Sequence, residues 1–350
     1  MNCKNFFYYG LCLLGLASCT KEYYTNEYVT NNEYVTNETV YTNKVYLSDS
    51  TPEITNDIRP EYLKDGDTVA IFAASNSVTE SQLSNGISVL KSWGLNVITA
   101  SNLYNTDGRF AGTQSERIAG LQQLIDNKHV KAVIAARGGY GATQVGQFID
   151  WSGMVENPKW LVGFSDVTYL HAILSNMGIE SIHGAMAYNL TNTNSVESLR
   201  KALFGELDSY SISTNSNCVE GEAEGRLVGG NLSLIYSLGG TANDLNVRNA
   251  ILLIEDTGEA NYSIDRMMNN LKQSGKLDNV KGIIVGEFIN MTQGVDLSIE
   301  EIMKEHLGSL GIPVIYGMKI GHDTENLAVY LGRQVMISVD SKNATLTFEK

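Results

Sequence analysis

The 350-residue sequence predicts an α/β protein: a parallel-sheet domain followed by a smaller, mixed α/β domain. Strand-like runs alternate with helix-like segments between residues 60 and 190, as is typical of right-handed βαβ units. After Gly221 the alternation continues, but it ends in two successive strand-like runs at 328–339 and 344–350, which indicates antiparallel pairing. The length also favours about two domains.

The first domain is expected over residues 60–190. It begins with an apolar run at 68–73, and a helix-like stretch closed by Gly94 follows. The next strand–helix pairs are expected at 95–101 and 115–127, at 130–136 and 142–148, and at 161–165 and 167–176. Loops at the carboxyl ends of such strands are where binding sites form.

The second domain is expected over residues 221–350, after a linker at 191–220. A Gly-rich strand–helix segment at 225–240 opens it. Strands are expected at 250–256 and 280–288, helices at 263–275 and 297–308, and a strand with its loop at 313–322, ahead of the two terminal strands.

The N-terminus reads as an export signal. Lys4 precedes an apolar run that is too short to span a bilayer, so residues 1–18 are interpreted as a signal peptide. Leu16 to Cys19 reads LASC, which resembles a bacterial lipobox; in such signals cleavage precedes the cysteine, which is then lipidated. This resemblance predicts a lipoprotein of the cell envelope, attached to a membrane through acyl chains on Cys19. A plain signal peptide is the alternative.

Residues 19–59 are polar and rich in tyrosine. The hexamer NEYVTN occurs at 26–31 and again at 32–37. We interpret the segment as an extended tether between the lipid anchor and the folded domains, with a tyrosine-rich interaction strip as the alternative.

Composition excludes several function classes. The net charge is −14, which argues against a nucleic-acid partner because phosphate binding needs clustered Lys and Arg. The five histidines and four cysteines show no metal-ligand spacing, and no phosphate-binding loop or dinucleotide fingerprint is present. We therefore expect neither a metal nor a cofactor.

Four strand-end segments carry the groups that serine catalysis requires. Ser165 lies at a strand-to-helix turn, the loop 137–141 reads RGGYG, Glu255 ends a strand, and His322 follows another. Each also has a structural interpretation: a serine at a helix start is commonly a cap, and a Gly-rich loop is commonly a turn. The residues alone leave both interpretations open.

The order of the motifs resembles that of the LD-carboxypeptidases, serine peptidases that include the microcin C self-immunity hydrolases. The resemblance runs from about Leu63 to the C-terminus. Its motifs are GDTVAIFAAS, GRFAGT, ARGGYGAT, LVGFSDVTYLHAIL, IHGAM, GRLVGGNLSLIYSLGGT, LLIEDTGEANYSIDRMM, GIIVGEF and IYGMKIGH. It implies a Rossmann-like N-terminal domain, a smaller C-terminal α/β domain, a cleft between them and a homodimer.

The resemblance also implies a catalytic triad. Ser165 would be the nucleophile, His322 the base, and Glu255 the acid that orients the base, with Glu259 as the alternative acid.

Further site residues follow from the same resemblance and from the loop chemistry. The N–H groups of Gly139 and Asp166 would form the oxyanion hole. Arg137 and Arg266 are candidates for pairing with a substrate carboxylate, because a guanidinium binds one through two hydrogen bonds. An ion pair with Asp265 or with another structural acid is an equal alternative for Arg266.

Three motifs depart from the family pattern. AASNS and HGAM replace A-P-S-S and H-G-P-M. After His322 this chain has YLG, at 330–332, where the family has Pro-Leu-Gly. These local changes bear on substrate preference more than on the triad.

The leading expectation is a serine carboxypeptidase that removes terminal D-alanine from the tetrapeptide stems of muropeptides in the envelope. A microcin-immunity-like peptidase and a non-catalytic lipoprotein that binds peptidoglycan or a protein are the alternatives.

Overall fold

The computed structural model describes residues 30–31, 44–45, 54 and 57–350. The predicted signal peptide, Cys19 and most of the predicted tether lie outside the described residues. Within the tether, β1 (Thr30–Asn31) pairs with β2 (Lys44–Val45) in antiparallel register. No helix in the described part of the chain combines the length and the apolar character that crossing a membrane requires.

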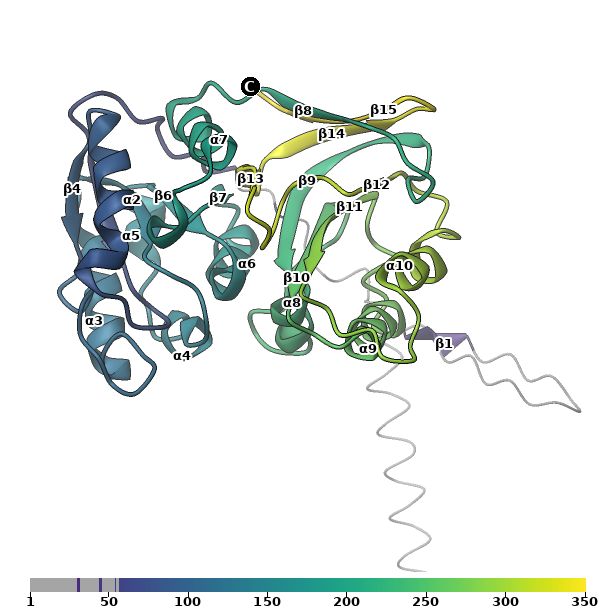
Figure 1. Cartoon of the computed structure of the whole chain (residues 1–350), viewed down its shortest axis with the longest axis horizontal. Helices are drawn as coiled ribbons and strands as arrows, with labels where there is room; N and C mark the ends of the chain where they lie inside the picture. Colours follow the sequence, from purple (N-terminus) through teal and green to yellow (C-terminus); the bar gives the residue numbers. More distant parts are fainter. Residues whose placement is uncertain (1–29, 32–43, 46–53, 55–56) are drawn as a thin grey trace, which may run out of the picture.

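Two sheets lie side by side in the molecule (Figure 1). The first has the order β13-β7-β6-β5-β3-β4, and its strands are parallel except for β13 at one edge. Its strands are β3 (Thr68–Phe72), β4 (Asn96–Thr99), β5 (Val130–Ala135), β6 (Trp160–Gly163), β7 (Ser181–His183) and β13 (Val329–Leu331).

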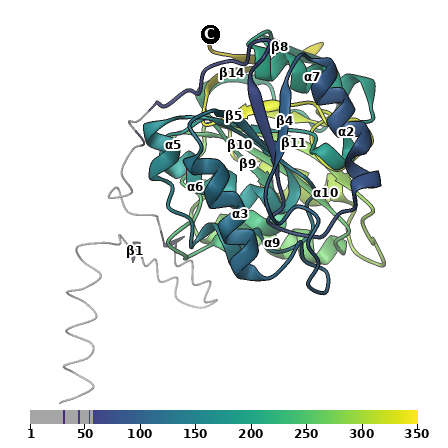
Figure 2. The same ribbon diagram turned by 90° about the vertical axis from the view of Figure 1, so that its left-hand side faces the viewer.

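Helices cover both faces of this first sheet (Figure 2). One face carries α2 (Glu80–Ser92), the 3-10 turn η2 (Ala187–Asn189) and α7 (Thr193–Phe204), and the other carries α3 (Gln114–Asp126), α4 (Ala142–Gly146), α5 (Ser152–Glu156) and α6 (Thr168–Asn176). Thr79 and Thr113 begin α2 and α3 with reciprocal capping boxes, which fix where these two helices start.

The second sheet has the order β12-β11-β10-β9-β14-β15-β8. Strands β9 to β12 are parallel, whereas β14, β15 and β8 add antiparallel pairs. Its strands are β8 (Ser209–Ser213), β9 (Gly221–Asn231), β10 (Ile251–Thr257), β11 (Gly282–Ile289), β12 (Val314–Tyr316), β14 (Gln334–Val339) and β15 (Asn343–Phe348). The parallel strands are connected by the helices α8 (Leu232–Leu238), α9 (Asn261–Gln273) and α10 (Ile299–Leu307).

The two-part α/β architecture predicted from the sequence is therefore confirmed. The segment expected as a linker, 191–220, holds the helix α7 and the edge strand β8. Asn192 caps α7 by accepting a hydrogen bond from the Ser195 N–H at 3.0 Å, and a left-handed Gly205 ends the helix.

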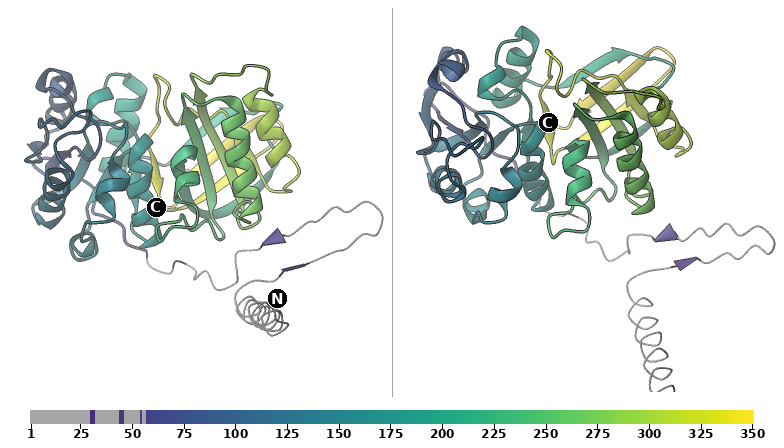
Figure 3. Two further views of the ribbon diagram at one scale, coloured as in Figure 1. Left: turned by 90° about the horizontal axis from the view of Figure 1, so that it is seen from below. Right: turned by 60° about the horizontal axis from the view of Figure 1, so that its bottom comes forward.

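The expected strand 328–339 divides into β13 and β14, which belong to different sheets. Gly332 makes this crossing possible, because its φ of 85° lies where residues with a Cβ are strained. In both views of Figure 3 the C-terminal chain, drawn in yellow, runs between the two halves of the molecule. Next to the crossing, buried Arg333 donates to buried Glu180 at 2.9 Å through its Nε. The C-terminal chain is thus part of the first sheet as well as the second.

Candidate active site

Ser165 occupies a sharp turn at the carboxyl end of β6. Its φ of 63° lies in the left-handed region, which is uncommon for a residue with a side chain. The 3-10 turn η1 (Ser165–Val167) starts at this serine and leads directly into α6. Such a strained strand-to-helix turn holds a nucleophilic serine in hydrolases of other folds. The half-buried serine is therefore placed as a nucleophile would be, and within residues 57–350 its side chain forms no hydrogen bond that would cap the turn.

The Gly-rich loop after β5 lies against Ser165. A Cβ on Gly138 would come within 3.1 Å of the Ser165 Oγ, so a larger residue would crowd the hydroxyl. The next residue, Gly139, has a φ of 118°, which favours glycine strongly. Within residues 57–350, the N–H groups of Gly139 and Asp166 donate to no other residue. Both predicted oxyanion donors are therefore available to a ligand.

The side chain of Asp166 has a separate, structural task. It is buried, and its Oδ2 accepts hydrogen bonds from the Ser75 Oγ at 2.5 Å and from the Ala142 N–H at 2.8 Å. These bonds tie the turn at Ser165 to the loop after β3 and to the start of α4. Only the backbone of Asp166 is left to face a substrate.

Glu255, on β10 of the second sheet, and His322, in the loop between β12 and β13, form a hydrogen-bonded pair. The His322 Nδ1 lies 2.6 Å from the Glu255 Oε2. The carboxylate is fully buried, while the imidazole is 14% exposed. Because Nδ1 is engaged, Nε2 is the nitrogen left to exchange a proton with a nucleophile or substrate.

The first sheet meets this pair through Phe164, the residue before the candidate nucleophile. The Phe164 and His322 rings pack edge to face, with centroids 4.8 Å apart. In the described chain the Ser165 hydroxyl makes no hydrogen bond to His322. Catalytic hydrogen bonds are often long before substrate binds and tighten in the complex.

Electrostatics favour an ionised carboxylate beside a strengthened base. Burial acts to raise the pKa of Glu255, but the charge of His322, the hydrogen bond from His322 and the nearby His183 together outweigh it, so this pKa is lowered. For His322, burial acts to lower the pKa, and the facing Glu255 carboxylate outweighs it, so that pKa is raised. This is the relation between acid and base that a catalytic triad uses.

The loop that carries His322 is held by buried polar groups. The Gly321 N–H donates to the Asn326 Oδ1 at 3.0 Å, and a Cβ at Gly321 would come within 2.9 Å of the Glu255 Oε2. The Asn326 N–H in turn donates to the Ser195 Oγ at 2.8 Å on α7. Helix α7, within the segment predicted as a linker, therefore supports the candidate base.

Glu259, the alternative acid, lies elsewhere. Its Oε1 accepts from the Ser233 Oγ at 3.5 Å, and among the described contacts it has none with His322. The neighbouring acid, Asp256, accepts from the Asn231 Nδ2 at 3.0 Å. The Asn231 N–H donates to the Thr168 Oγ1 at 3.0 Å, which joins the second sheet to the start of α6. The geometry favours Glu255 as the partner of His322.

The two candidate substrate-binding arginines lie over aromatic rings. The guanidinium of Arg137 is 4.9 Å from the ring centre of Tyr188, and that of Arg266 is 5.5 Å from the ring centre of Tyr262. Neither forms an ion pair in the described chain. Asp265, weighed above as a partner of Arg266, instead binds the His306 Nε2 at 2.7 Å. Their roles in substrate binding stay predictions.

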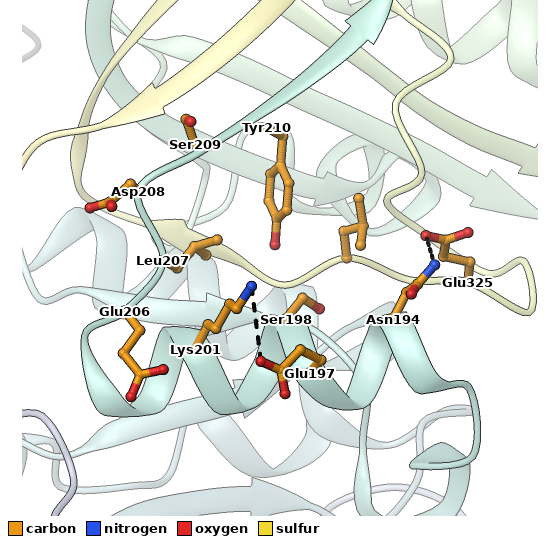
Figure 4. Close-up of a pocket in the computed structure, with 11 residues that line it drawn as sticks. Asn194, Glu197, Ser198, Lys201, Glu206, Leu207, Asp208, Ser209, Tyr210 and Glu325 are labelled. Atoms are coloured by element: carbon orange, nitrogen blue, oxygen red, sulfur yellow. Dashed lines mark hydrogen bonds and ion pairs between the residues drawn. The ribbon is translucent and has the colours of Figure 1, made fainter.

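A pocket of about 510 Å³ lies outside this site, between α7, β8 and the loop before β13 (Figure 4). Two polar contacts join residues that line this pocket. Lys201 forms an ion pair with Glu197 at 3.9 Å, and Asn194 donates a hydrogen bond to Glu325 at 3.0 Å. None of the three candidate catalytic residues lines it. The site is identified by chemistry at the strand ends and not by this pocket.

Comparison with known proteins bears directly on this arrangement. Residues 69–184 match the model of the LD-carboxypeptidase N-terminal domain, and residues 224–337 match that of the C-terminal domain. A probable murein peptide carboxypeptidase of Bacillus subtilis is 36% identical over 299 residues, which cover 82% of this chain and 94% of the relative. The chain belongs to the LD-carboxypeptidase family. The resemblance found in the sequence is thereby confirmed, and the chain is a serine-type carboxypeptidase, a hydrolase.

Solved structures of this family share the fold. A muramoyltetrapeptide carboxypeptidase from Oxalobacter formigenes superposes with a TM-score of 0.74 at 26% identity, covering 81% of this chain and 99% of that one. The protein MccF, solved in complex with glutamyl sulfamoyl guanosine, gives a TM-score of 0.75 at 25% identity, covering 83% and 98%. Both neighbours match nearly their whole length.

Several residues that shape the site of this LD-carboxypeptidase were not predicted from the sequence. Asn326 and Ser195 support the His322 loop, and Asn231 links the two sheets. His183 lies in the motif IHGAM, but no pattern in the sequence marks it as part of the site. Its burial beside Glu255 is visible in three dimensions alone.

Proposed function

We propose that this LD-carboxypeptidase removes the terminal D-alanine from tetrapeptide stems of muropeptides. The observation that carries the proposal is the buried Glu255–His322 pair, which packs against the turn that presents Ser165. The substrate class is supported by the similarity to murein peptide and muramoyltetrapeptide carboxypeptidases.

In the proposed mechanism, the Ser165 Oγ attacks the carbonyl carbon between the L-configured centre of the third stem residue and D-alanine. His322 takes the serine proton at Nε2, while Glu255 fixes the imidazole and stabilises its positive charge. The N–H groups of Gly139 and Asp166 bind the oxyanion of the tetrahedral intermediate.

Collapse of the intermediate breaks the C–N bond, and His322 gives its proton to the departing amine of D-alanine. Water then attacks the ester on Ser165, with His322 accepting the proton of that water. The tripeptide stem leaves with a new carboxylate, and Ser165 regains its proton from His322.

Hydrolysis of a peptidyl-nucleotide amide is the second candidate, because MccF was solved with glutamyl sulfamoyl guanosine. The export signal predicted at residues 1–18 favours the muropeptide, since an immunity enzyme of that kind acts on a toxin inside the cell.

A substrate panel separates the two candidates. We expect the full-length chain to release D-alanine from a disaccharide tetrapeptide and none from the matched disaccharide pentapeptide, whose terminal bond joins two D-residues. Glutamyl sulfamoyl guanosine should be left largely intact. Free D-alanine and free glutamate would be quantified by chromatography. Cleavage of the nucleotide analogue alone would replace the proposal with the second candidate.

We also propose that lipid on Cys19 holds the enzyme at an envelope membrane, where peptidoglycan stems are within reach. The LASC sequence at 16–19 supports this placement. Cells expressing the chain should incorporate labelled palmitate into it, and most of the protein should sediment with membranes. Cys19→Ala should lose the label and become soluble; equal labelling of this variant would refute the anchor. The homodimer stays a prediction of the resemblance.

A further inference from the structure

His183 is a buried histidine for which the proposed mechanism has no use. It ends β7, and its backbone pairs with Gly163 of β6 and Val329 of β13. Its side chain is fully buried, and neither ring nitrogen has a hydrogen-bond partner within the described residues. A buried polar group without a partner is costly, so its presence asks for a reason.

The nearest group of opposite character is the candidate triad acid. The His183 Nε2 lies 3.8 Å from the Glu255 Oε1, and that oxygen is also buried and lacks a partner in the described chain. The other oxygen of the same carboxylate, Oε2, holds the His322 Nδ1 at 2.6 Å. The carboxylate therefore lies between two imidazoles, one at the end of β7 in the first sheet and one in the loop between β12 and β13.

The distance of 3.8 Å between the His183 Nε2 and the Glu255 Oε1 is somewhat too long for a hydrogen bond, because N···O hydrogen bonds measure about 2.7–3.2 Å. The His183 and Phe164 ring centroids are 5.8 Å apart, and Phe164 also packs on His322. A small closure of the two sheets around a substrate would thus bring the Nε2 and the Oε1 within bonding distance. The turn that carries Ser165 would move with them, because Gly163 pairs with His183.

We propose that His183 is a positioning residue, whose Nε2–H donates to the Glu255 Oε1 in the reactive state and fixes the carboxylate across the two sheets. Glu255 then orients His322 through Oε2 while its second oxygen is held by the sheet that carries the nucleophile. This inference rests on the proposed serine mechanism but not on the identity of the substrate.

The other ionisable groups around this contact do not take its place. On α6, His171 donates from Nε2 to the Gly163 carbonyl at 2.9 Å and accepts from the Ser181 Oγ at 2.8 Å through Nδ1, and burial lowers its pKa to about 3. On β10, Asp256 is bonded by Asn231 and Ser233. The groups that face the Glu255 carboxylate closely are His183 and His322.

Two variants of His183 separate positioning from packing. His183→Phe keeps an aromatic ring but has no donor, whereas His183→Gln places an amide N–H near the position of the lost Nε2–H. His129→Gln, at an exposed position before β5, is the matched control for loss of a histidine. Each full-length variant would be tested for its melting temperature and for kcat and KM across pH.

We expect His183→Phe to lower kcat by about 10- to 100-fold, with little change in KM. Loss of a residue that orients a metal-binding side chain has an effect of this size in metalloenzymes. The acidic limb of kcat/KM should move to higher pH, because a carboxylate with one donor fewer holds the His322 proton more tightly. His183→Gln should keep most of the activity and the wild-type limb. A pure packing role predicts the reverse order, with phenylalanine tolerated better than glutamine, and that result would overturn the proposal.

Two further measurements test the role of His183 if the proposed substrate is wrong or if the phenylalanine variant does not fold. The rate at which a fluorophosphonate modifies Ser165 reports the same machinery without any muropeptide, so the inference can be judged even if the proposed substrate is wrong. If His183→Phe does not fold, proton NMR of the wild-type chain decides. With the phosphonylated serine in place, we expect a downfield Nε2–H signal from His183 that Glu255→Gln shifts upfield; no such signal would overturn the contact.

Discussion

Replacing Ser165 with alanine is expected to lower kcat for D-alanine release by roughly 10⁶-fold, the scale of loss when a serine peptidase loses its nucleophile. The hydroxyl lies beside the Gly-rich loop that would bind the oxyanion, where a Cβ on Gly138 would come within 3.1 Å of it. Release of D-alanine would be followed under single-turnover conditions with the full-length variant. A loss of less than tenfold would show that Ser165 is not the nucleophile.

A second substitution at the same position separates chemistry from folding. Ser165 has a φ of 63°, which strains any residue with a Cβ but not glycine. Ser165→Gly is therefore expected to be as inactive as Ser165→Ala but more stable by about 1 kcal/mol in urea unfolding. A glycine variant that unfolds more easily than the alanine variant would argue against stored strain at the turn.

Replacing Glu255 with glutamine is expected to lower kcat by about 10⁴-fold, because an amide no longer fixes the reactive imidazole tautomer or stabilises its charge. It should also shift the pH profile. Since Glu255 raises the pKa of His322, and only neutral His322 accepts the serine proton, wild-type kcat/KM should rise with pH through a pKa above about 6.5.

Without the carboxylate that pKa falls, so the acidic limb of Glu255→Gln should lie at lower pH than that of the wild type. Glu259→Gln is the matched control, because Glu259 lies just beyond the end of β10, four residues after Glu255, but has no described contact with His322. Its acidic limb should match that of the wild type. A shift in the Glu259 variant, with none in the Glu255 variant, would exchange the roles of the two acids.

The sequence was sufficient to predict the alternation of strands and helices and the strand ends that carry Ser165, Glu255 and His322. These features depend on local patterns: apolar runs of strand length, helical periodicity, and glycines where a loop must approach closely. The resemblance then assigned an expected role to each strand end. The pairing of His322 with Glu255 is the geometry that such roles require.

The crossing of the C-terminal chain was not predictable from local pattern. Residues 328–339 read as one strand because strand-like apolar residues lie on both sides of Gly332. The partners of the two halves lie far away in sequence. The first half pairs with β7 and the second with β9. Contacts between distant segments decide which sheet each half joins.

Helix α7 was missed for a related reason. Its residues are largely polar, so they resemble a linker. Ser195 contributes to the site only by accepting a hydrogen bond from the Asn326 N–H, 131 residues further on. No local pattern marks His183 as part of the site either. Its position opposite Glu255 results from the packing of the two sheets, which no spacing along the chain records.

The central claim is that one serine on the first sheet, served by a histidine on the second, releases D-alanine. The most direct test measures D-alanine from disaccharide tetrapeptide with equal amounts of the full-length wild type and its Ser165→Ala variant, after circular dichroism has shown both to be folded. The account predicts stoichiometric release by the wild type and none above background by the variant. Release by both at the same rate would contradict it.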